Sequence, residues 1–454
     1  MSGHLTNEEQ ETILAAVRAR RTPETYAPGK WSVSPMNRDP RVLSGPLPGH
    51  YPRRVRIRDI TLRTIEQAPN VVVDGPQRAR LAEALIDAGV SSLMLAWLST
   101  PHAHRSLADE AAALKQRKPD LELVAIGADR TQVDRAVESG VGMFEVYSPC
   151  IPEFHPIYGP YGRMILRAHW RGEDWRRSVR FPRSEAEQLA MFHEQIDYVK
   201  ERGLRACAFA SMLHYATPDY LASFARTAKL AGADEITLGD GASGLGPEAW
   251  AYIVGIIRRE APGVPVGIHA HNAFGLVTAS TLAAVHAGAE VVEVSVNGLC
   301  SAAGQADLAE VVAALEVVYG VQTGIDLQAL TPLRRLVEDI SGIPMAANKA
   351  VTGEHAWTYT EEAMREESAY APVHKAAEPE VFGSRARYAL GPHSGTWNMR
   401  SKLDELGLDA EPRVVEATLE RVKEELAIRR RGLADEEIAQ IARKVGARDA
   451  APAH

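Results

Sequence analysis

The sequence contains little cysteine and no long apolar run. Its three cysteines, Cys150, Cys207 and Cys300, are too few and too scattered for a disulfide framework or a four-cysteine zinc site. This favours a reducing compartment, and we expect a cytoplasmic protein. No apolar run reaches the roughly 18 residues that a membrane-spanning helix needs. Residues 1–48 are polar and lack the apolar core of a signal peptide. We therefore expect neither a membrane span nor secretion.

An excess of positive charge is also missing. The 51 Lys and Arg residues stand against 59 Asp and Glu residues, which gives a formal net charge of −8. General nucleic-acid binders and membrane-surface binders need a basic field, so both classes of protein are disfavoured. The 454 residues are 45% hydrophobic, which is enough for a large core. At roughly 150 residues per domain, this length suggests two or three folded units.

Short β-branched runs alternate with longer stretches of helical periodicity from about residue 54 onward. Most helical stretches end in a small-residue link such as Asp87-Ala-Gly89, which is typical of a helix end. Eight strands, each followed by a helix, indicate a (β/α)8 TIM barrel, with an open doubly wound sheet as the alternative. The predicted strands are 55–61, 92–97, 121–127, 143–147, 205–210, 235–239, 265–271 and 291–296. The predicted helices are 77–88, 103–116, 131–139, 185–201, 218–230, 247–259, 276–286 and 306–319.

The segments outside this alternation of strands and helices differ from it in composition. Prolines from Pro23 to Pro48 break any regular structure near the beginning of the chain, which suggests an arm that lies on something, such as a second subunit. The expected parts are an N-terminal arm at 1–50, the TIM-barrel catalytic domain at 51–325, a small mixed post-barrel subdomain at 326–400 and a helical C-terminal region at 401–454.

An unusually long connection joins the fourth predicted strand to its helix. Residues 148–183 far exceed the usual loop length and are rich in arginine. Because such a loop lies on the active face of a TIM barrel, one interpretation is a lid that presents cations to an anionic substrate or to phosphate groups. The other is a surface insertion that packs on a partner subunit. The arginines are Arg163, Arg167, Arg171, Arg176, Arg177, Arg180 and Arg183.

Two histidines stand two residues apart at the end of the seventh predicted strand, in Gly267-Ile-His269-Ala-His271-Asn272. Side chains alternate along a strand, so both imidazoles are expected to face the barrel mouth. Two imidazoles on one face suit Zn²⁺, Mn²⁺, Fe²⁺ or Co²⁺, although a site usually needs a third protein ligand. The alternative is that they are hydrogen-bonded groups that line a pocket. We expect Asn272 beside them to contact the substrate.

The first predicted strand ends in an unusually polar segment. Asp59, Thr61 and Arg63 share one face of this strand, where an interior position is expected. Burying a charge is costly unless it is paired, so Asp59 and Arg63 form either a structural ion pair or part of the site. An arginine there can clamp a carboxylate or stabilise a developing enolate charge. Asp59 and Gln67 are our candidates for substrate contacts.

Further candidates follow other strands. Cys300 lies in a turn of small residues after the eighth strand. It has either a catalytic role, as an acid or a nucleophile, or is an inert thiol. Asn297 in the same turn is a candidate for substrate binding. Asp240 after the sixth strand either orients a ligand or caps the next helix. Ser211 and His214 follow the fifth strand, and we expect Ser211 to bind substrate and His214 to act in catalysis.

Several of these motifs resemble those of the pyruvate carboxyltransferase-like family, which comprises isopropylmalate, homocitrate and citramalate synthases and hydroxymethylglutaryl-CoA lyase. The resemblance covers roughly residues 54–410. The barrel motifs that carry it are Asp59-Ile-Thr-Leu-Arg63-Thr-Ile-Glu66-Gln67, His269-Ala-His271-Asn272 and Val296-Asn-Gly298 through Gly304. Ala347-Asn-Lys349 to Gly353 and Leu390-Gly-Pro-His393-Ser394-Gly395 are similar to the subdomain that follows the barrel in the synthases.

The resemblance implies a divalent metal that chelates a 2-oxo acid, whose ketone is attacked by the enolate of an acyl-CoA. It implies that His269 and His271 are metal ligands and that Arg63 stabilises the enolate. It also implies a homodimer that pairs its arms and post-barrel regions across a two-fold axis.

The sequence departs from the family pattern at positions that should carry charge. Thr64 stands where the family has an aspartate as third metal ligand, and a hydroxyl is a weak ligand by comparison. Asp59, His214 and Asp240 are candidates to replace it, as is a carboxylate of the substrate. The other departures are Met94 for the acid after the second strand, Ser211 or Met212 for the acid after the fifth, Cys300-Ser-Ala for a Gly-Glu-Arg segment, and Met364 near the expected subdomain histidine.

Three functions are compatible with these residues. The first is an enzyme that makes or breaks a carbon–carbon bond next to a carbonyl. It would bind a small 2-oxo acid or related carboxylate through Arg63 and a metal, and the arginine-rich loop would bind an anionic co-substrate. The second is a metal-independent barrel that uses acid–base chemistry by His214, His271, Tyr215 or Cys300. The third is a non-catalytic homologue that binds a metabolite or a partner subunit.

Overall fold

The computed structural model describes most of the chain after residue 49. The chain divides into two compact units. The first consists of Met1–Asp326 and Leu333–Ile343, and the second consists of Leu327–Pro332 and Pro344–His454. Apart from Arg171, the arginines of the long loop lie outside the described residues, as do Met364 and nearly all of the predicted N-terminal arm. The residues described are 50–98, 107–150, 171–172, 184–360 and 377–450, with isolated positions before residue 50.

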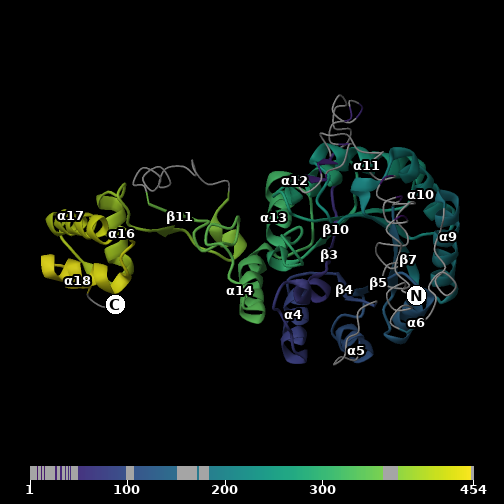
Figure 1. Cartoon of the computed structure of the whole chain (residues 1–454). Helices are drawn as coiled ribbons and strands as arrows, with labels where there is room; N and C mark the ends of the chain where they lie inside the picture. Colours follow the sequence, from purple (N-terminus) through teal and green to yellow (C-terminus); the bar gives the residue numbers. More distant parts are fainter. Residues whose placement is uncertain are drawn as a thin grey trace. The chain divides into compact units, whose positions relative to one another are not determined.

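Eight parallel strands in the first unit close into a barrel (Figure 1). Each strand pairs with its neighbours along the chain, and the eighth strand pairs with the first, with Val294 opposite Asp59. This closure confirms the predicted TIM barrel and excludes the open sheet. The strands are β3 (Arg56–Asp59), β4 (Ser92–Trp97), β5 (Glu122–Gly127), β6 (Met143–Pro149), β7 (Arg205–Ser211), β8 (Glu235–Asp240), β9 (Val266–Ala270) and β10 (Val291–Val294).

The predicted helices follow these strands, and most bounds shift by a few residues at most. The last helix, predicted to reach 319, ends at Ala313 and continues as a π-helical turn, Ala314–Val318. Side chains start helices where the sequence offers a cap: Asp74 and Gln77 form a capping box, and Ser184 and Thr217 each accept the backbone N–H group three residues on. The helices are α4 (Gly75–Asp87), α5 (Leu107–Arg117), α6 (Arg130–Glu138), α9 (Glu185–Glu201), α10 (Pro218–Leu230), α11 (Pro247–Glu260), α12 (Val277–His286) and α13 (Leu308–Ala313).

The first strand is shorter than predicted. It ends at Asp59, and Thr61–Thr64 form the short helix α3, followed by the 3-10 turn η2 (Ile65–Gln67). The carboxylate of Asp59 accepts hydrogen bonds of 2.9 Å from both the backbone N–H and the hydroxyl of Thr61. Local bonds of this kind compete with strand pairing and turn the chain. The prediction that Asp59, Thr61 and Arg63 share one strand face was therefore wrong.

An apolar cluster fills part of the barrel interior. It is built from β4 to β7 and the residue after β3, and Trp97 and Tyr147 pack against it. Met94, where the resemblance to the family predicts an acid, is fully buried in this cluster. The interior below the strand ends is therefore apolar on this side of the barrel. The members of the cluster are Ile60, Met94, Val124, Ile126, Met143, Cys207 and Phe209.

In the described part of the second unit, three helices surround a small core. They are α16 (Thr396–Glu405), α17 (Pro412–Arg429) and α18 (Asp435–Val445), and buried Met399, Val422 and Ile438 lie between them. Short strands pair at its edges, β11 (Thr358–Tyr359) with β12 (Arg387–Tyr388) and β13 (Leu408–Asp409) with β14 (Arg448–Asp449). Among the helices that the structure describes, in either unit, none has the length and apolar character of a bilayer span.

Candidate active site

A cavity of about 430 Å³ opens at the carboxyl ends of the barrel strands. This is the end at which TIM-barrel active sites lie, because the loops after the strands converge there. Trp97 at the end of β4 and Ser211 at the end of β7 both contribute to the wall. The cavity brings together these predicted site residues: Arg63, Gln67, Ser211, His214, His269 and His271.

The two histidines lie side by side in this cavity. Their Nε2 atoms are 3.2 Å apart, and Nδ1 of His269 is 2.7 Å from a carboxylate oxygen of Glu293 on β10. In a neutral His269 whose Nδ1 proton goes to Glu293, the Nε2 atom carries a lone pair. Burial, with His269 and Arg63 nearby, lowers the pKa of His271 to about 3, so its imidazole is neutral. Either His271 donates its Nε2 proton to His269, or both nitrogens present lone pairs to one cation.

The separation of the two nitrogens fits a shared metal ion. Two nitrogens at about 2.1 Å from one metal lie about 3.2 Å apart when the angle at the metal is about 100°. The hydrogen bond from His269 to Glu293 is the carboxylate–histidine contact that orients a metal ligand and raises its basicity. The residues present therefore fit a divalent transition metal with two imidazole ligands.

A third protein ligand is not in place among the described residues. The hydroxyl of Thr64 donates to the carbonyl of Ile60 within its own helix. Asp59 is occupied by Thr61, and Asp240 lies 3.0 Å from Nδ1 of His214. The remaining coordination positions of a metal at this place would fall to substrate oxygens or water.

Below the histidines lies a buried charge layer centred on Arg58. Its guanidinium is completely buried, donates a hydrogen bond of 2.8 Å to Glu145 and makes ion pairs of 2.7 Å with Glu235 and 3.3 Å with Glu293. Burial and the neighbouring Glu293 raise the pKa of Glu145 well above its usual range, so this acid is neutral and donates to Glu293. Burial also opposes the ionisation of Glu293, but the hydrogen bond from His269 outweighs it and holds the pKa of Glu293 at about 2.

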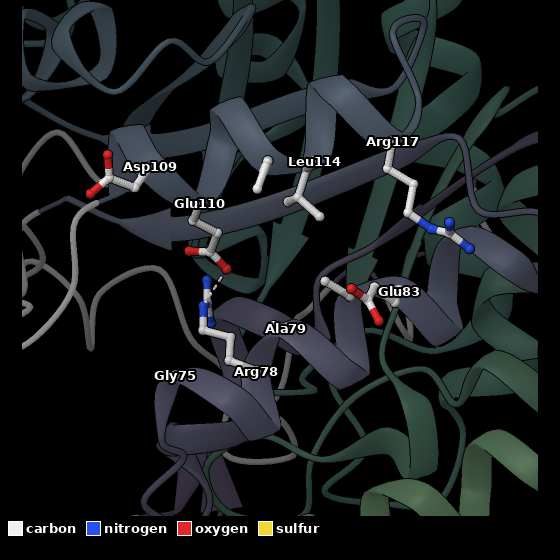
Figure 2. Close-up of a pocket in the computed structure, with 10 residues that line it drawn as sticks. Gly75, Arg78, Ala79, Glu83, Asp109, Glu110, Leu114 and Arg117 are labelled. Atoms are coloured by element: carbon white, nitrogen blue, oxygen red, sulfur yellow. Dashed lines mark hydrogen bonds and ion pairs between the residues drawn. The ribbon is translucent and has the colours of Figure 1, made fainter.

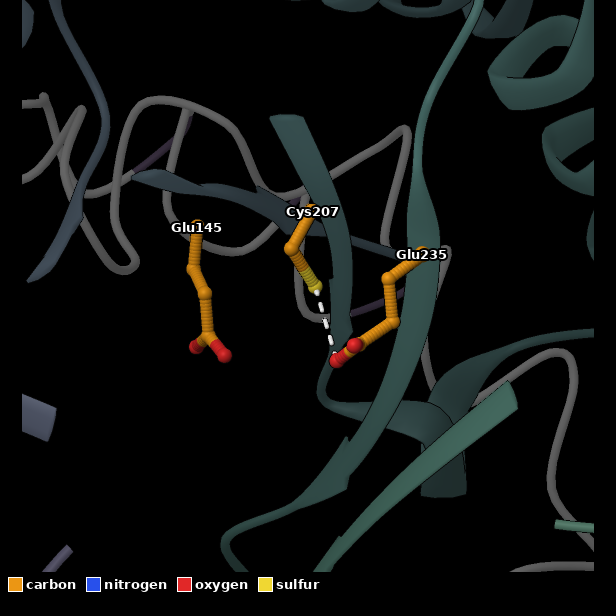
Figure 3. A group of neighbouring side chains, drawn as sticks. All are labelled: Glu145, Cys207 and Glu235. Atoms are coloured by element: carbon orange, nitrogen blue, oxygen red, sulfur yellow. Dashed lines mark hydrogen bonds between the residues drawn. The ribbon is translucent and has the colours of Figure 1, made fainter. Parts of the chain in front are cut away.

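Glu145, Cys207 and Glu235 form a group with metal-ligand spacing (Figure 3). Within the described part of the chain it is the one group of three His, Cys, Asp or Glu side chains whose ligand atoms all lie within 4.8 Å. The Arg58 guanidinium already donates to the neutral Glu145 and to the carboxylate of Glu235. Burial raises the pKa of Cys207 well above its usual range, so it is a thiol. This group is a structural ion cluster rather than a metal site.

Arg63 and Gln67 line the cavity from the segment after β3. The Arg63 guanidinium carbon lies 5.6 Å from the centre of the Trp97 ring, close enough for a cation–π contact. Gln67 accepts a hydrogen bond of 3.1 Å from the thiol of Cys300, and Cys300 itself does not line the cavity. The structure thus brings Arg63 and Gln67 to the site and sets Cys300 behind Gln67.

A second cavity, of about 320 Å³, lies between α4 and α5 (Figure 2). Arg78 crosses its base, where Nε bonds to Glu110 at 2.6 Å and the terminal nitrogens donate to the carbonyls of Leu62 and Leu95. Because Leu62 belongs to α3 and Leu95 to β4, Arg78 ties the helix that carries Arg63 to the neighbouring strand. Its role is to position α3.

His214 forms a pair with Asp240 on the far wall of the cavity. Its Nδ1 atom is 3.0 Å from Asp240, which also accepts the backbone N–H groups of Ala242 and Leu245. The residue before this turn, Met212, has a left-handed φ of 57°, which is uncommon for a bulky side chain and typical of functional turns. An imidazole held by a carboxylate in this way is suited to proton transfer.

Asn272 and Asn297 do not line the cavity. The side chain of Asn272 accepts the N–H of Val277 at the beginning of α12, and that of Asn297 donates to the carbonyl of Arg334. Asp59 and Asp240 likewise use their oxygens on neighbouring backbone and side-chain groups. The substrate contacts expected for these residues stay predictions, and their observed bonds shape the turns around the site.

Two features of the site were missed in the sequence. One is the set of buried acids Glu145, Glu235 and Glu293, whose only signal was an acidic residue inside an otherwise apolar strand run. The other is a set of three cavity-lining aromatic residues, Trp97, Tyr147 and Phe209. Aromatic residues in strands usually indicate core, so their place in the cavity had no sequence signal.

The barrel, the cavity at its strand ends and the paired histidines define a TIM-barrel enzyme. Residues 171–337 match the HMGL-like family. The chain is 30% identical to the homocitrate synthase AksA of Methanopyrus kandleri over 87% of this chain and 93% of that protein. It is 31% identical to the 2-isopropylmalate synthase of Methanocaldococcus jannaschii over 79% of this chain and 65% of that protein.

The solved structure of hydroxymethylglutaryl-CoA lyase from Pseudomonas aeruginosa shares the fold, with a TM-score of 0.54, 20% identity and coverage of 71% of this chain and 99% of that one. The chain therefore belongs to the HMGL-like family, within the pyruvate carboxyltransferase-like superfamily of synthases and lyases. This confirms the family to which the sequence motifs pointed.

Proposed function

We propose that this chain forms or breaks a carbon–carbon bond next to the carbonyl of a small 2-oxo acid or a related carboxylate. The observation that carries the proposal is the pair of imidazole Nε2 atoms 3.2 Å apart, with Arg63 lining the same cavity. The membership of the chain in a family of carbon–carbon bond-forming synthases supports the reaction class.

The residues of the cavity divide the work between binding and charge stabilisation. The fork of Arg63 suits the carboxylate of the acid or the oxygen of an enolate, and Gln67 and Ser211 add hydrogen-bonding groups. A divalent metal on His269 and His271 would supply Lewis-acid polarisation of the substrate carbonyl. Glu293 holds the ring of His269 so that its Nε2 faces His271.

Proton transfer in this proposal belongs to His214. Its ring lines the cavity, and the carboxylate of Asp240 lies 3.0 Å from its Nδ1 atom, which favours an imidazole that gives up and takes up a proton on the cavity side. This pair replaces the carboxylates that the family resemblance would lead one to expect near Met94 and Met212 as general base. The same pair also favours a second candidate, acid–base chemistry on the barrel without a metal.

We also propose an acyl-CoA thioester as co-substrate, a homodimer as the assembly and the cytoplasm as the compartment. The first two rest on the family. The third is supported by the cysteines, because all three are free and buried.

The test is a product assay with a panel of 2-oxo acids and acyl-CoA thioesters. Release of free CoA and a condensation product seen by mass spectrometry are expected with protein loaded with Mn²⁺, Co²⁺ or Zn²⁺ and lost after exhaustive chelation. Arg63→Lys, which keeps the charge but not the fork, should lower kcat/KM by about 100-fold or more. Activity that survives chelation would establish the second candidate. If no 2-oxo acid of the panel is turned over and none binds, both candidate functions are contradicted.

A further inference from the structure

Three aromatic side chains form a continuous arc along one wall of the candidate active site. The rings of Trp97 and Tyr147 lie 5.4 Å apart between centres, and those of Tyr147 and Phe209 lie 5.7 Å apart and nearly parallel, at 16°. They come from β4, β6 and β7, which are adjacent in the barrel apart from β5 between the first two. All three line the 430 Å³ cavity. We call Trp97, Tyr147 and Phe209 the aromatic arc.

The arc joins the two charged ends of the site. At one end the guanidinium of Arg63 lies 5.6 Å from the centre of the Trp97 ring. At the other end the edge of the Phe209 ring meets the His269 imidazole, with centres 5.5 Å apart and planes at 70°. A ligand that bonds to Arg63 and to the histidine pair together therefore has the ring faces beside it.

The rings of the arc pack closely against their surroundings. A Cβ atom on Gly239 would lie 2.6 Å from the Phe209 ring, so the ring occupies space that only a glycine in β8 leaves open. Below the arc lies the apolar cluster that contains Met94 and Ile126. The resemblance to the family predicts an acid near Met94, and the structure has this apolar side chain buried there.

The cavity is also larger than a short aliphatic acid needs. A volume of about 430 Å³ lies within the range of about 300–1,000 Å³ that holds drug-sized ligands. Flat aromatic faces bind best to another flat aromatic group, in stacked or edge-to-face contact.

We propose that the acid bound here carries an aromatic ring: its carboxylate and carbonyl end lies between Arg63 and the histidine pair, and its aryl group lies on the aromatic arc. The substrate class is thus an aryl-substituted 2-oxo acid rather than a short aliphatic one. This inference rests on the proposed function, because it needs a 2-oxo acid at the histidine pair.

Titration calorimetry of the purified chain with Mn²⁺ tests it, with phenylpyruvate and pyruvate as probes and 3-cyclohexylpyruvate as a probe of equal bulk without a π face. Phenylpyruvate is expected to bind at least about tenfold more tightly than pyruvate, from burial of the ring and its contacts with the arc. The cyclohexyl acid should fall between them. This wild-type comparison does not depend on any variant folding.

Variants then assign the preference to the arc. Trp97→Leu and Tyr147→Leu should each lower the preference for phenylpyruvate over pyruvate by about threefold or more, while the Kd of pyruvate changes little. Tyr147→Phe keeps the ring and is the matched control, which should retain the preference. Thermal unfolding of each variant verifies that it folds.

The outcomes separate this inference from the proposed function. If pyruvate binds as tightly as phenylpyruvate or more tightly, the aryl substrate is excluded and the proposed function stands. If the leucine variants weaken both acids equally, the arc does not set the preference and the inference fails. If none of the three acids binds, the proposed function fails and this inference fails with it.

Discussion

The barrel mouth has two sides of different chemistry. On the polar side, His271, His269 and Glu293 form a chain of contacts that reaches Arg58, and Arg63 lines the same cavity. The opposite side is the aromatic arc on the apolar cluster around Met94. The resemblance to the family rests on the histidines and Arg63, and it places two expected acids at Met94 and near Ser211, on the other side. In our proposals the polar side carries the reaction and the aromatic arc selects the substrate.

The difference also predicts how the two sides respond to substitution. The charges on the polar side depend on one another, because removing one leaves its buried partners unpaired. The rings of the arc contribute mainly shape and area, so their replacement should alter binding more than folding.

The largest expected effect comes from breaking the charge layer. Arg58→Leu removes the buried cation between Glu235 and Glu293, although Glu235 keeps its ion pair with Arg56. It should lower the free energy of unfolding by about 3–5 kcal/mol. Glu145→Gln is the matched control, since Glu145 is already neutral and an amide preserves a donor toward Glu293. It should cost less than about 1 kcal/mol. Urea unfolding of both variants provides the measurement, and equal losses would contradict the charge assignment.

The next effect depends on pH. Burial raises the pKa of Asp59 from 3.8 to about 7, against the opposing hydrogen bonds from Thr61. The folded chain therefore holds this proton more tightly than the unfolded chain does. The stability that the carboxyl contributes is greatest below the unfolded pKa and declines as pH rises from about 4 to about 7.

Asp59→Asn, which is neutral at every pH, should therefore be more stable than wild type at pH 8, by on the order of a few kcal/mol. The advantage should shrink toward pH 5. Chemical unfolding at both pH values measures it. An advantage that is the same at pH 5 and pH 8 would show that Asp59 does not bind a proton in this range.

A moderate effect is expected from the contact that orients His269. Glu293→Gln removes the charge that accepts the Nδ1 proton and should weaken binding of Zn²⁺ or Co²⁺ by about 10- to 100-fold. Competition with a chromophoric chelator measures the affinity. Tyr147→Phe on the opposite side is the control and should leave metal affinity unchanged. Loss of affinity in both variants would show that the two sides are coupled.

The smallest effect tests the opposite side alone. Gly239→Ala adds a Cβ that would lie 2.6 Å from the Phe209 ring, so the ring must shift. We expect a loss of about 1–2 kcal/mol in stability and weaker binding of phenylpyruvate, with metal affinity unchanged. Unfolding and calorimetry on the same sample check this separation. Unaltered phenylpyruvate binding would contradict the role assigned to Phe209.

The sequence was sufficient for the architecture because each strand and helix carries a local pattern. The predicted helices 185–201 and 218–230 match α9 and α10 to the residue. The histidine pair was also predictable, since both residues lie on one strand end. The first strand was not, because the bond between Asp59 and Thr61 ends it early and makes Arg58 the interior charge.

The remainder of the site is assembled from distant parts of the chain. Arg58 meets acids that lie 87, 177 and 235 residues away, and the aromatic arc comes from three strands. No spacing in the sequence records such contacts, because they depend on how the barrel closes. A buried acid in an apolar strand was the one signal present, and it does not name its partner.

The measurement that tests the central claim most directly is the metal content of the protein by plasma mass spectrometry, after reloading with Zn²⁺, Mn²⁺ or Co²⁺. The account predicts about one ion per chain for wild type, its loss in the His269→Ala, His271→Ala double variant, and full retention in His193→Ala, where an exposed histidine on α9 is removed. A wild type that holds no metal after reloading, or a double variant that holds as much as wild type, would contradict it.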